Sequence, residues 1–277
     1  MKEEAYLVTG ATGTIGTQVV HALLRLGKRV RILTRNATEH SKNIEVFEGD
    51  LNKPHTLKEA LVGITGIHLI SFGDENYNPL SSGKQIIEMV ENAGVKRVTV
   101  LWNGEGNESS IEQEVKKSNL EWTILQPQEY MANALGWAES IKESSEVKEP
   151  FGDRPTAVVN ETDIGEVVCK ILTTGGHSKQ IYTLTGPDTL TPKKQVQEIA
   201  VALNKEVKFI ELDEHQTKKR WKDWGLPKET MEYLYEWYGN TPSVGYTVTN
   251  TVEQILGTPP RTFKEWTIEN LHHFHTK

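Results

Sequence analysis

The sequence predicts a doubly wound α/β fold, in which a parallel sheet is covered by helices on both faces. Short strand-like runs rich in Val, Ile and Leu alternate with amphipathic helix-like segments through the first half of the chain. That alternation is typical of a parallel sheet whose crossover connections are helices. A glycine-spaced turn over residues 10–16 joins the first strand to the first helix. The length of 277 residues allows one such domain and an appended lobe.

Strands and helices are expected to alternate through much of the chain. The first strand ends near Thr9, and the helix after the glycine turn runs to about Arg25. Further strands are expected at 28–35, 44–48, 67–72, 98–102 and 122–126, and helices at 54–61, 79–92, 110–118, 162–172, 191–203 and 227–238. Residues 1–150 are expected to form the sheet domain, with 157–185 returning to it. Residues 186–277 are then a smaller, mainly helical lobe.

The glycine turn has the spacing that suits a dinucleotide pyrophosphate. Gly10 lets the chain turn out of the strand, Gly13 lets the backbone approach a phosphate, and Gly16 lets the helix pack closely. The helix N-terminus offers unpaired N–H groups to an anion. The groups expected at the phosphates belong to Gly10, Thr12, Gly13, Thr14 and Ile15. An ordinary tight turn is the alternative, but the position between a strand and a helix favours a cofactor site.

Arg35, at the end of the second strand, predicts which dinucleotide binds. An acidic residue there would bind the ribose 2′-hydroxyl and repel a 2′-phosphate, whereas a guanidinium can bind that phosphate through two hydrogen bonds. The sequence has no Asp or Glu from Arg35 until Glu39. NADP(H) is therefore favoured over NAD(H). The alternative is a solvated basic strand end, because Arg29 and Arg31 show that this strand carries several arginines.

Residues that directly follow the predicted strands are the next candidates, because ligands of such sheets lie outside the carboxyl ends of the strands. They are Asp50, Leu51, Ser71, Phe72, Gly73, Trp102, Asn103 and Gln126. Asp50 is a candidate to accept from the adenine amino group, with Leu51 covering the ring; Asp50 as a helix cap or turn residue is the alternative. Trp102 and Asn103 are expected to face the nicotinamide and the substrate, and buried packing is the alternative for Trp102.

These features together resemble the NmrA-like atypical short-chain dehydrogenases. The resemblance is carried by residues 10–16, 35, 49–51, 93–98, 122–127, 130–133, 162–165, 184–187 and 257–263, and so covers almost the whole chain. It implies a Rossmann domain, a C-terminal substrate lobe and NADP(H) binding. Some members resemble quinone, azo or imine reductases, and others are redox-sensing regulators without turnover.

The chain departs from ordinary short-chain dehydrogenases at the proton donor. None of its eight tyrosines is followed by lysine four residues later, so the usual Tyr-x-x-x-Lys pair is absent. The segment 110–117 resembles the family version in which a glutamate, here Glu114, replaces that pair, and Gln126 stands where the family has an arginine. Glu114 and Tyr130 are the candidate catalytic residues, and Tyr130 is also a candidate for substrate binding. A solvated Glu114 and a core Tyr130 are the alternatives.

Composition limits the remaining function classes. A net charge of −7 disfavours nucleic-acid binding, and no apolar run is long enough for a membrane span. The single Cys169 rules out an internal disulfide and fits a reducing compartment, so a cytoplasmic location is expected. The histidines at 272, 273 and 275 lack companion ligands, so no metal is expected. Aromatic residues spaced along 221–238 would suit a flat substrate, although core packing is favoured for them.

The sequence thus favours an NADP(H)-dependent oxidoreductase that reduces a small conjugated or aromatic acceptor such as a quinone, azo or imine compound. The first alternative is a non-catalytic NADP(H) sensor that binds a protein partner. The second is an enzyme similar to sugar-nucleotide epimerases, which the missing tyrosine-lysine pair disfavours.

Overall fold

The computed structural model describes residues 4–36, 44–73, 79–102 and 108–275. The chain forms two compact units, and each unit is assembled from three separate stretches. Unit 1 comprises Met1–Pro127, Glu161–Leu184 and Thr251–Thr258; unit 2 comprises Gln128–Asn160, Thr185–Asn250 and Pro259–Lys277. Among the described residues, every helix is too short or too polar to cross a membrane.

Unit 1 is built on a parallel sheet, and the predicted fold class is confirmed. Within the described residues the sheet has seven strands in the order β3-β2-β1-β4-β5-β6-β8, and every neighbouring pair is parallel. The strands are β1 (Ala5–Thr9), β2 (Arg29–Thr34), β3 (Ile44–Glu48), β4 (Gly66–Ile70), β5 (Arg97–Leu101), β6 (Glu121–Pro127) and β8 (Gln180–Leu184). The strand order reverses between β1 and β4, which is the point where doubly wound sheets bind ligands.

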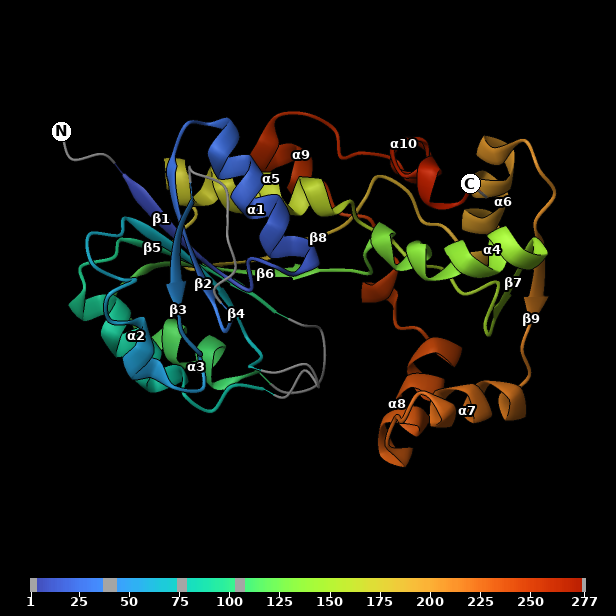
Figure 1. Ribbon diagram of the computed structural model, residues 1–277, viewed down its shortest axis with the longest axis horizontal. Helices are drawn as coiled ribbons and strands as arrows, with labels where there is room; N and C mark the ends of the chain where they lie inside the picture. Colours follow the sequence, from blue (N-terminus) through green and yellow to red (C-terminus); the bar gives the residue numbers. More distant parts are fainter. Residues whose placement is uncertain (1–3, 37–43, 74–78, 103–107, 276–277) are drawn as a thin grey trace. The chain divides into compact units, whose positions relative to one another are not determined.

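Helices cover both faces of this sheet (Figure 1). One face carries α1 (Thr14–Arg25), α5 (Glu161–Thr174) and α9 (Thr251–Leu256), and the other carries α2 (Gly83–Asn92) and α3 (Ser110–Lys117). Buried aliphatic side chains of β1, β4 and β5, such as Leu7, Leu69 and Val100, pack with Ile86 of α2 and Ile111 of α3 in one core cluster. Strands buried on both faces explain their nearly continuous apolar runs.

The expected helix over 54–61 forms only in part. The structure has a short 3₁₀ helix at Pro54–Leu57, followed by turns. The Thr56 hydroxyl donates to the Lys53 carbonyl (2.7 Å) and accepts from the Asp50 N–H (2.9 Å). Such local bonds between side chain and backbone compete with a regular helix. Gly63 follows with a φ of 72°, a left-handed conformation that no helix could continue.

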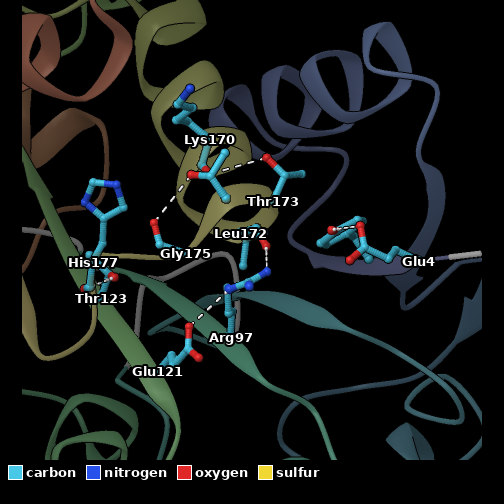
Figure 2. Close-up of polar contacts among 11 residues, drawn as sticks. Glu4, Arg97, Glu121, Thr123, Lys170, Leu172, Thr173, Gly175 and His177 are labelled. Carbon is cyan, nitrogen blue, oxygen red and sulfur yellow. Dashed lines mark hydrogen bonds and ion pairs between the residues drawn. The ribbon is translucent and has the colours of Figure 1, made fainter.

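Helix α5 brings the chain back to unit 1, and Arg97 of β5 binds the C-terminal end of this helix (Figure 2). Arg97 Nη1 donates to the Leu172 carbonyl (2.9 Å), and its Nε donates to Glu121 of β6 (3.1 Å). Nearby, the Thr123 hydroxyl donates to the His177 carbonyl (2.8 Å), just before β8 begins. A cation at a helix C-terminus satisfies carbonyls that have no partner within the helix.

Unit 2 is smaller and contains both helices and a short sheet. Its strands β7 (Glu146–Glu149) and β9 (Lys208–Glu211) pair in parallel. Its helices are α4 (Ala138–Ser144), α6 (Pro192–Leu203), α7 (Glu214–Asp223), α8 (Lys228–Gly239) and α10 (Phe263–Glu269), with 3₁₀ helices at Met131–Trp137, Ser243–Gly245 and Leu271–His273.

The division between the units lies earlier in the chain than the predicted boundary at residue 150. Residues 128–150 belong to unit 2 because β7 pairs with β9, whose sequence lies about sixty residues further on. Residues 251–258, which include α9, belong to unit 1, although they fall inside the stretch expected to be the C-terminal lobe.

Candidate functional site

The turn between β1 and α1 has the geometry expected of an anion-binding loop. Gly10 adopts a φ of 62°, and its carbonyl accepts from the Gly13 N–H (3.0 Å). Helix α1 begins at Thr14, and no side chain caps its N-terminus. Thr12, Gly13 and Thr14 are exposed, whereas Ile15 is buried. Backbone N–H groups and the positive end of the helix dipole are therefore presented at the surface of unit 1.

Gly13 and Gly16 are needed for different reasons. A Cβ added to Gly16 would lie 2.1 Å from the Gly10 carbonyl oxygen, so the turn can close only over a glycine. The close packing that Gly16 allows is therefore between the first turn of α1 and the backbone of the preceding loop. A Cβ added to Gly13 would meet only the Gly10 carbonyl oxygen, at 3.3 Å. The space beside Gly13 is therefore bounded by this one backbone atom and is much less crowded than that beside Gly16, which leaves room for the approach of a phosphate.

Arg35 directly follows β2, whereas the two other arginines of this segment lie within the strand. Arg31 Nε donates to Glu45 of β3 (2.7 Å), and Arg29 forms an ion pair with the same carboxylate. Those bonds hold the pKa of the Glu45 carboxyl below its usual value, with the Arg29 bond contributing most. Arg35 lies beyond the last residue of β2, on the exposed surface. It is thus the arginine of this segment that lies at the carboxyl end of the strand.

Asp50 and Leu51 lie just beyond β3, where the sequence placed them, and both have structural roles. The Asp50 carboxylate accepts from the Asn52 N–H (2.9 Å), which closes the turn before the 3₁₀ helix. Leu51 is buried in the core, and its carbonyl accepts from the Ser82 hydroxyl (2.7 Å). The hydrogen bond from Asn52 thus agrees with the alternative interpretation, in which Asp50 is a turn residue.

The segment after β4 contains a buried hydroxyl without a partner. Ser71 Oγ is buried and has no hydrogen-bond partner within the described part of the chain. The Ser71 carbonyl accepts from the Leu80 N–H (3.1 Å), and the Gly73 carbonyl accepts from Asn52 Nδ2 (3.1 Å). Phe72 forms a bridge with Pro79. A buried polar atom without a partner costs free energy, so Ser71 Oγ is available to a ligand at the switch point.

The ends of β5 and β6 lie next to each other, as the parallel order requires. The backbone N–H of Trp102 donates to the Leu125 carbonyl (3.0 Å), and the partly buried indole ring packs against the core cluster. Gln126 lies opposite Thr183 of β8 and is half-buried. Asn103, the remaining candidate at this edge, lies outside the described residues.

The two candidate catalytic residues belong to different units. Glu114 of α3 forms an ion pair with Lys117 (2.6 Å), an arrangement of neighbouring charges on one helix turn. Tyr130 lies in unit 2, where it precedes the 3₁₀ helix Met131–Trp137 in an extended conformation. It pairs with Val159 in a parallel bridge and is half-buried.

Sequence reasoning passed over Glu112, the buried carboxyl at the start of α3. One of its oxygens accepts from the Ser109 N–H (2.5 Å), and the other has no partner among the described residues. Burial raises the pKa of the Glu112 carboxyl. The pattern Ser109-x-x-Glu112 is a capping box, so this role could have been recognised in the sequence.

His68 of β4 is a second buried polar residue that sequence reasoning passed over. Its Nδ1 lies 2.9 Å from Thr99 Oγ1 of β5, and Nε2 has no partner among the described residues. Burial lowers the pKa of His68 to about 4. Its sequence context, a single histidine within an apolar strand, indicates burial but no particular partner.

Comparison with known proteins supports the same cofactor-binding architecture. The model of the NmrA-like family matches residues 2–267. The chain is 28% identical to an NAD(P)H azoreductase from Xenophilus azovorans, over 94% of this chain and 96% of the relative. It is 27% identical to a (4-alkanoyl-5-oxo-2,5-dihydrofuran-3-yl)methyl phosphate reductase from Streptomyces griseus, over 97% and 98% of the two chains.

Solved structures agree on the fold. The NADPH-dependent quinone oxidoreductase from Escherichia coli, crystallised with NADPH, superimposes with a TM-score of 0.80 over 96% of this chain and 99% of that chain. The two sequences are 22% identical, so this likeness concerns the fold alone.

Proposed function

Because the chain belongs to the NmrA-like family, we propose that it is an NADPH-dependent reductase of a small conjugated or aromatic acceptor, such as a quinone, azo or imine compound. The two relatives described above are named as reductases, and one of those names includes NAD(P)H. They match this chain over nearly their full lengths, so both units of the chain have counterparts in them.

The observation that carries the proposal is the uncapped start of α1 beside the β1–β4 switch point. The exposed Thr12–Thr14 backbone and the left-handed Gly10 fit a pyrophosphate, and the unpartnered Ser71 hydroxyl lies at the end of the neighbouring strand. NADPH bound there would supply a hydride from its nicotinamide ring. The contribution of the chain is to bind the phosphates, orient the ring and exclude water.

The preference for NADPH over NADH is assigned to Arg35. Arg35 directly follows β2 on the exposed surface, and the two arginines within that strand pair with Glu45. A 2′-phosphate at this position would gain charge-assisted hydrogen bonds from Arg35.

The choice of acceptor follows from the missing tyrosine-lysine pair. A simple ketone requires a proton at oxygen as hydride arrives, whereas quinones and iminium ions need little acid catalysis. Of the two candidate donors, Glu114 of α3 is partly buried, and its carboxylate pairs with Lys117. Tyr130 is half-buried and held by its bridge to Val159, so we assign proton donation to Tyr130.

The test is a measurement of NADPH oxidation against a panel that contains a quinone, an azo dye, an iminium dye and a simple ketone. Turnover with one of the first three and little with the ketone is expected. Tyr130→Phe should then lower kcat more than it changes KM. If no acceptor is reduced and a protein partner binds with different affinity in NADP and NADPH, the reductase proposal is wrong and the sensor alternative holds.

A further inference from the structure

One ion pair of unit 2 has the geometry of a strong interaction. Arg154 donates to the Glu129 carboxylate through both terminal nitrogens, at 2.7 and 3.0 Å. The two side chains are 13% and 29% exposed, so solvent screens them only in part. The Thr156 hydroxyl also reaches the same carboxylate, at 3.4 Å. A bidentate arginine–carboxylate pair fixes orientation as well as distance, unlike most surface ion pairs.

The same guanidinium also contacts helix α8. Its central carbon lies 4.4 Å from the centre of the Tyr238 ring, a cation–π contact. No residue of α8 is fully buried, and its Tyr235 and Tyr238 rings also contact Trp221 of α7. The Phe151 ring meets Tyr235 edge-on (4.9 Å between ring centres), and the Phe151 carbonyl accepts from the Arg154 N–H (2.9 Å). Residues 151–154 thus form one attachment point for α8.

Glu129, the other member of the ion pair, directly precedes Tyr130 in the chain. The Glu129 carbonyl accepts from the Val159 N–H (2.8 Å), and the Met131 N–H donates to the Val159 carbonyl (3.1 Å). Tyr130 therefore lies between two backbone hydrogen bonds to one residue. Glu129 lies at a bend of the chain, directly before Tyr130 in its isolated bridge to Val159. The ion pair therefore acts on the backbone next to the tyrosine.

We propose that Glu129 and Arg154 are positioning residues for Tyr130, and that they couple its orientation to the placement of α8. The role in turnover rests on the proposed function, in which Tyr130 donates the proton. Neither residue touches the reacting atoms in this proposal. Their effect is to hold the phenol in one place, and small displacements of a catalytic group are costly to rate.

The kinetic test uses Glu129→Gln, which removes the charge-assisted pair and retains the backbone bonds to Val159. With an acceptor that the wild type reduces, kcat should fall about tenfold or more, while the Kd for NADPH is unchanged. In a Tyr130→Phe background, Glu129→Gln should have no further effect on kcat, because its action passes through the phenol. Equal losses of kcat in both backgrounds would overturn the proposal.

Asp153→Asn is the matched control. Asp153 neighbours Arg154 and pairs with Lys193 (2.6 Å), but its side chain is 80% exposed. This variant removes an ion pair of the same loop without touching Glu129, and it should leave kcat unchanged. If Asp153→Asn lowers kcat as much as Glu129→Gln does, then any change of charge in this loop lowers kcat. The specific role assigned to Glu129 would then be wrong.

A second measurement does not require turnover. In protein labelled with 3-fluorotyrosine, the ¹⁹F resonance of Tyr130 is assigned by its absence in Tyr130→Phe. Glu129→Gln and Arg154→Met should each shift or broaden both this resonance and that of Tyr238, whereas Asp153→Asn should shift neither. An unmoved Tyr130 resonance would overturn the coupling. If the coupling is seen but no acceptor is reduced, the proposed function fails and the positioning inference stands.

Discussion

At the scale of single residues, Arg35 decides between the two nicotinamide cofactors in the proposed function. Arg35→Asp should narrow or reverse a preference for NADPH, because a carboxylate repels the 2′-phosphate and accepts from a 2′-hydroxyl. A charge-assisted contact of this kind contributes ~1.5–3 kcal/mol, or about ten- to a hundredfold in Kd. Titration of both cofactors measures it. Arg29→Gln is the control, and it should leave the cofactor preference unchanged, since Arg29 is paired with Glu45. Equal affinities of the wild type for NADPH and NADH would show that Arg35 does not have this role.

Gly13 and Gly16 should respond differently to the same substitution. Gly13→Val should abolish cofactor binding and leave the fold intact, because the added side chain enters the space of the pyrophosphate and meets little protein. Gly16→Val should destabilise the protein itself, since its Cβ would overlap the Gly10 carbonyl. Circular dichroism and urea unfolding beside a cofactor titration separate the two effects. Normal binding by Gly13→Val would place the phosphate site elsewhere.

His68 should make stability depend on pH in a defined window. The pKa of His68 is about 4 in the folded protein and 6.5 when unperturbed, so between these values the unfolded chain binds more protons. The free energy of unfolding should therefore fall as the pH drops from 6.5 to 4, by at most about 3 kcal/mol. His68→Gln, which cannot titrate, should flatten that part of the profile. Identical profiles for variant and wild type would contradict the assignment to His68.

At the scale of elements, the C-terminus of α5 depends on one side chain from the sheet. Arg97→Met should lower the free energy of unfolding by about 1–2 kcal/mol, because the Leu172 carbonyl loses its donor and the helix end loses a cation. Urea unfolding measures this. Glu121→Gln breaks only the ion pair to a half-exposed carboxylate and should cost less than about 1 kcal/mol. Equal losses in the two variants would show that the ion pair, and not the helix cap, is the stabilising contact.

Elements whose signals are local were predictable, and contacts between distant segments were not. The first turn and α1 follow from glycine spacing and helical periodicity, and the structure has α1 at Thr14–Arg25. The Glu129–Arg154 pair joins residues 25 positions apart, and nothing in the sequence selects Arg154 as the partner. The same limit explains why the boundary was predicted at residue 150 rather than where the units divide, since the pairing of β7 with β9 has no local signal in the sequence.

At the scale of the whole molecule, the order of segments along the chain makes the sheet domain discontinuous. Helix α5 and strand β8 return to unit 1 after an excursion of the chain through unit 2. Strand β8 pairs with β6 along its length, and α5 packs against α1 so closely that a Cβ on Gly165 would lie 2.6 Å from the Gln18 backbone. The first 150 residues contain the cofactor fingerprint, but they lack three elements of the unit that presents it, namely α5, β8 and α9.

A fragment of residues 1–150 should therefore fail to fold as a cooperative unit. Without α5, the side of α1 that packs against it would meet water. Each apolar side chain exposed there would give up about 1.5–3 kcal/mol, so a few of them offset much of the 5–15 kcal/mol that holds a typical domain together. Loss of β8 would also leave β6 as an unpaired edge. Urea unfolding and proteolysis, with the full chain as control, test this. A sharp two-state transition in the fragment, with NADPH binding retained, would show that α5 and β8 are dispensable to the domain.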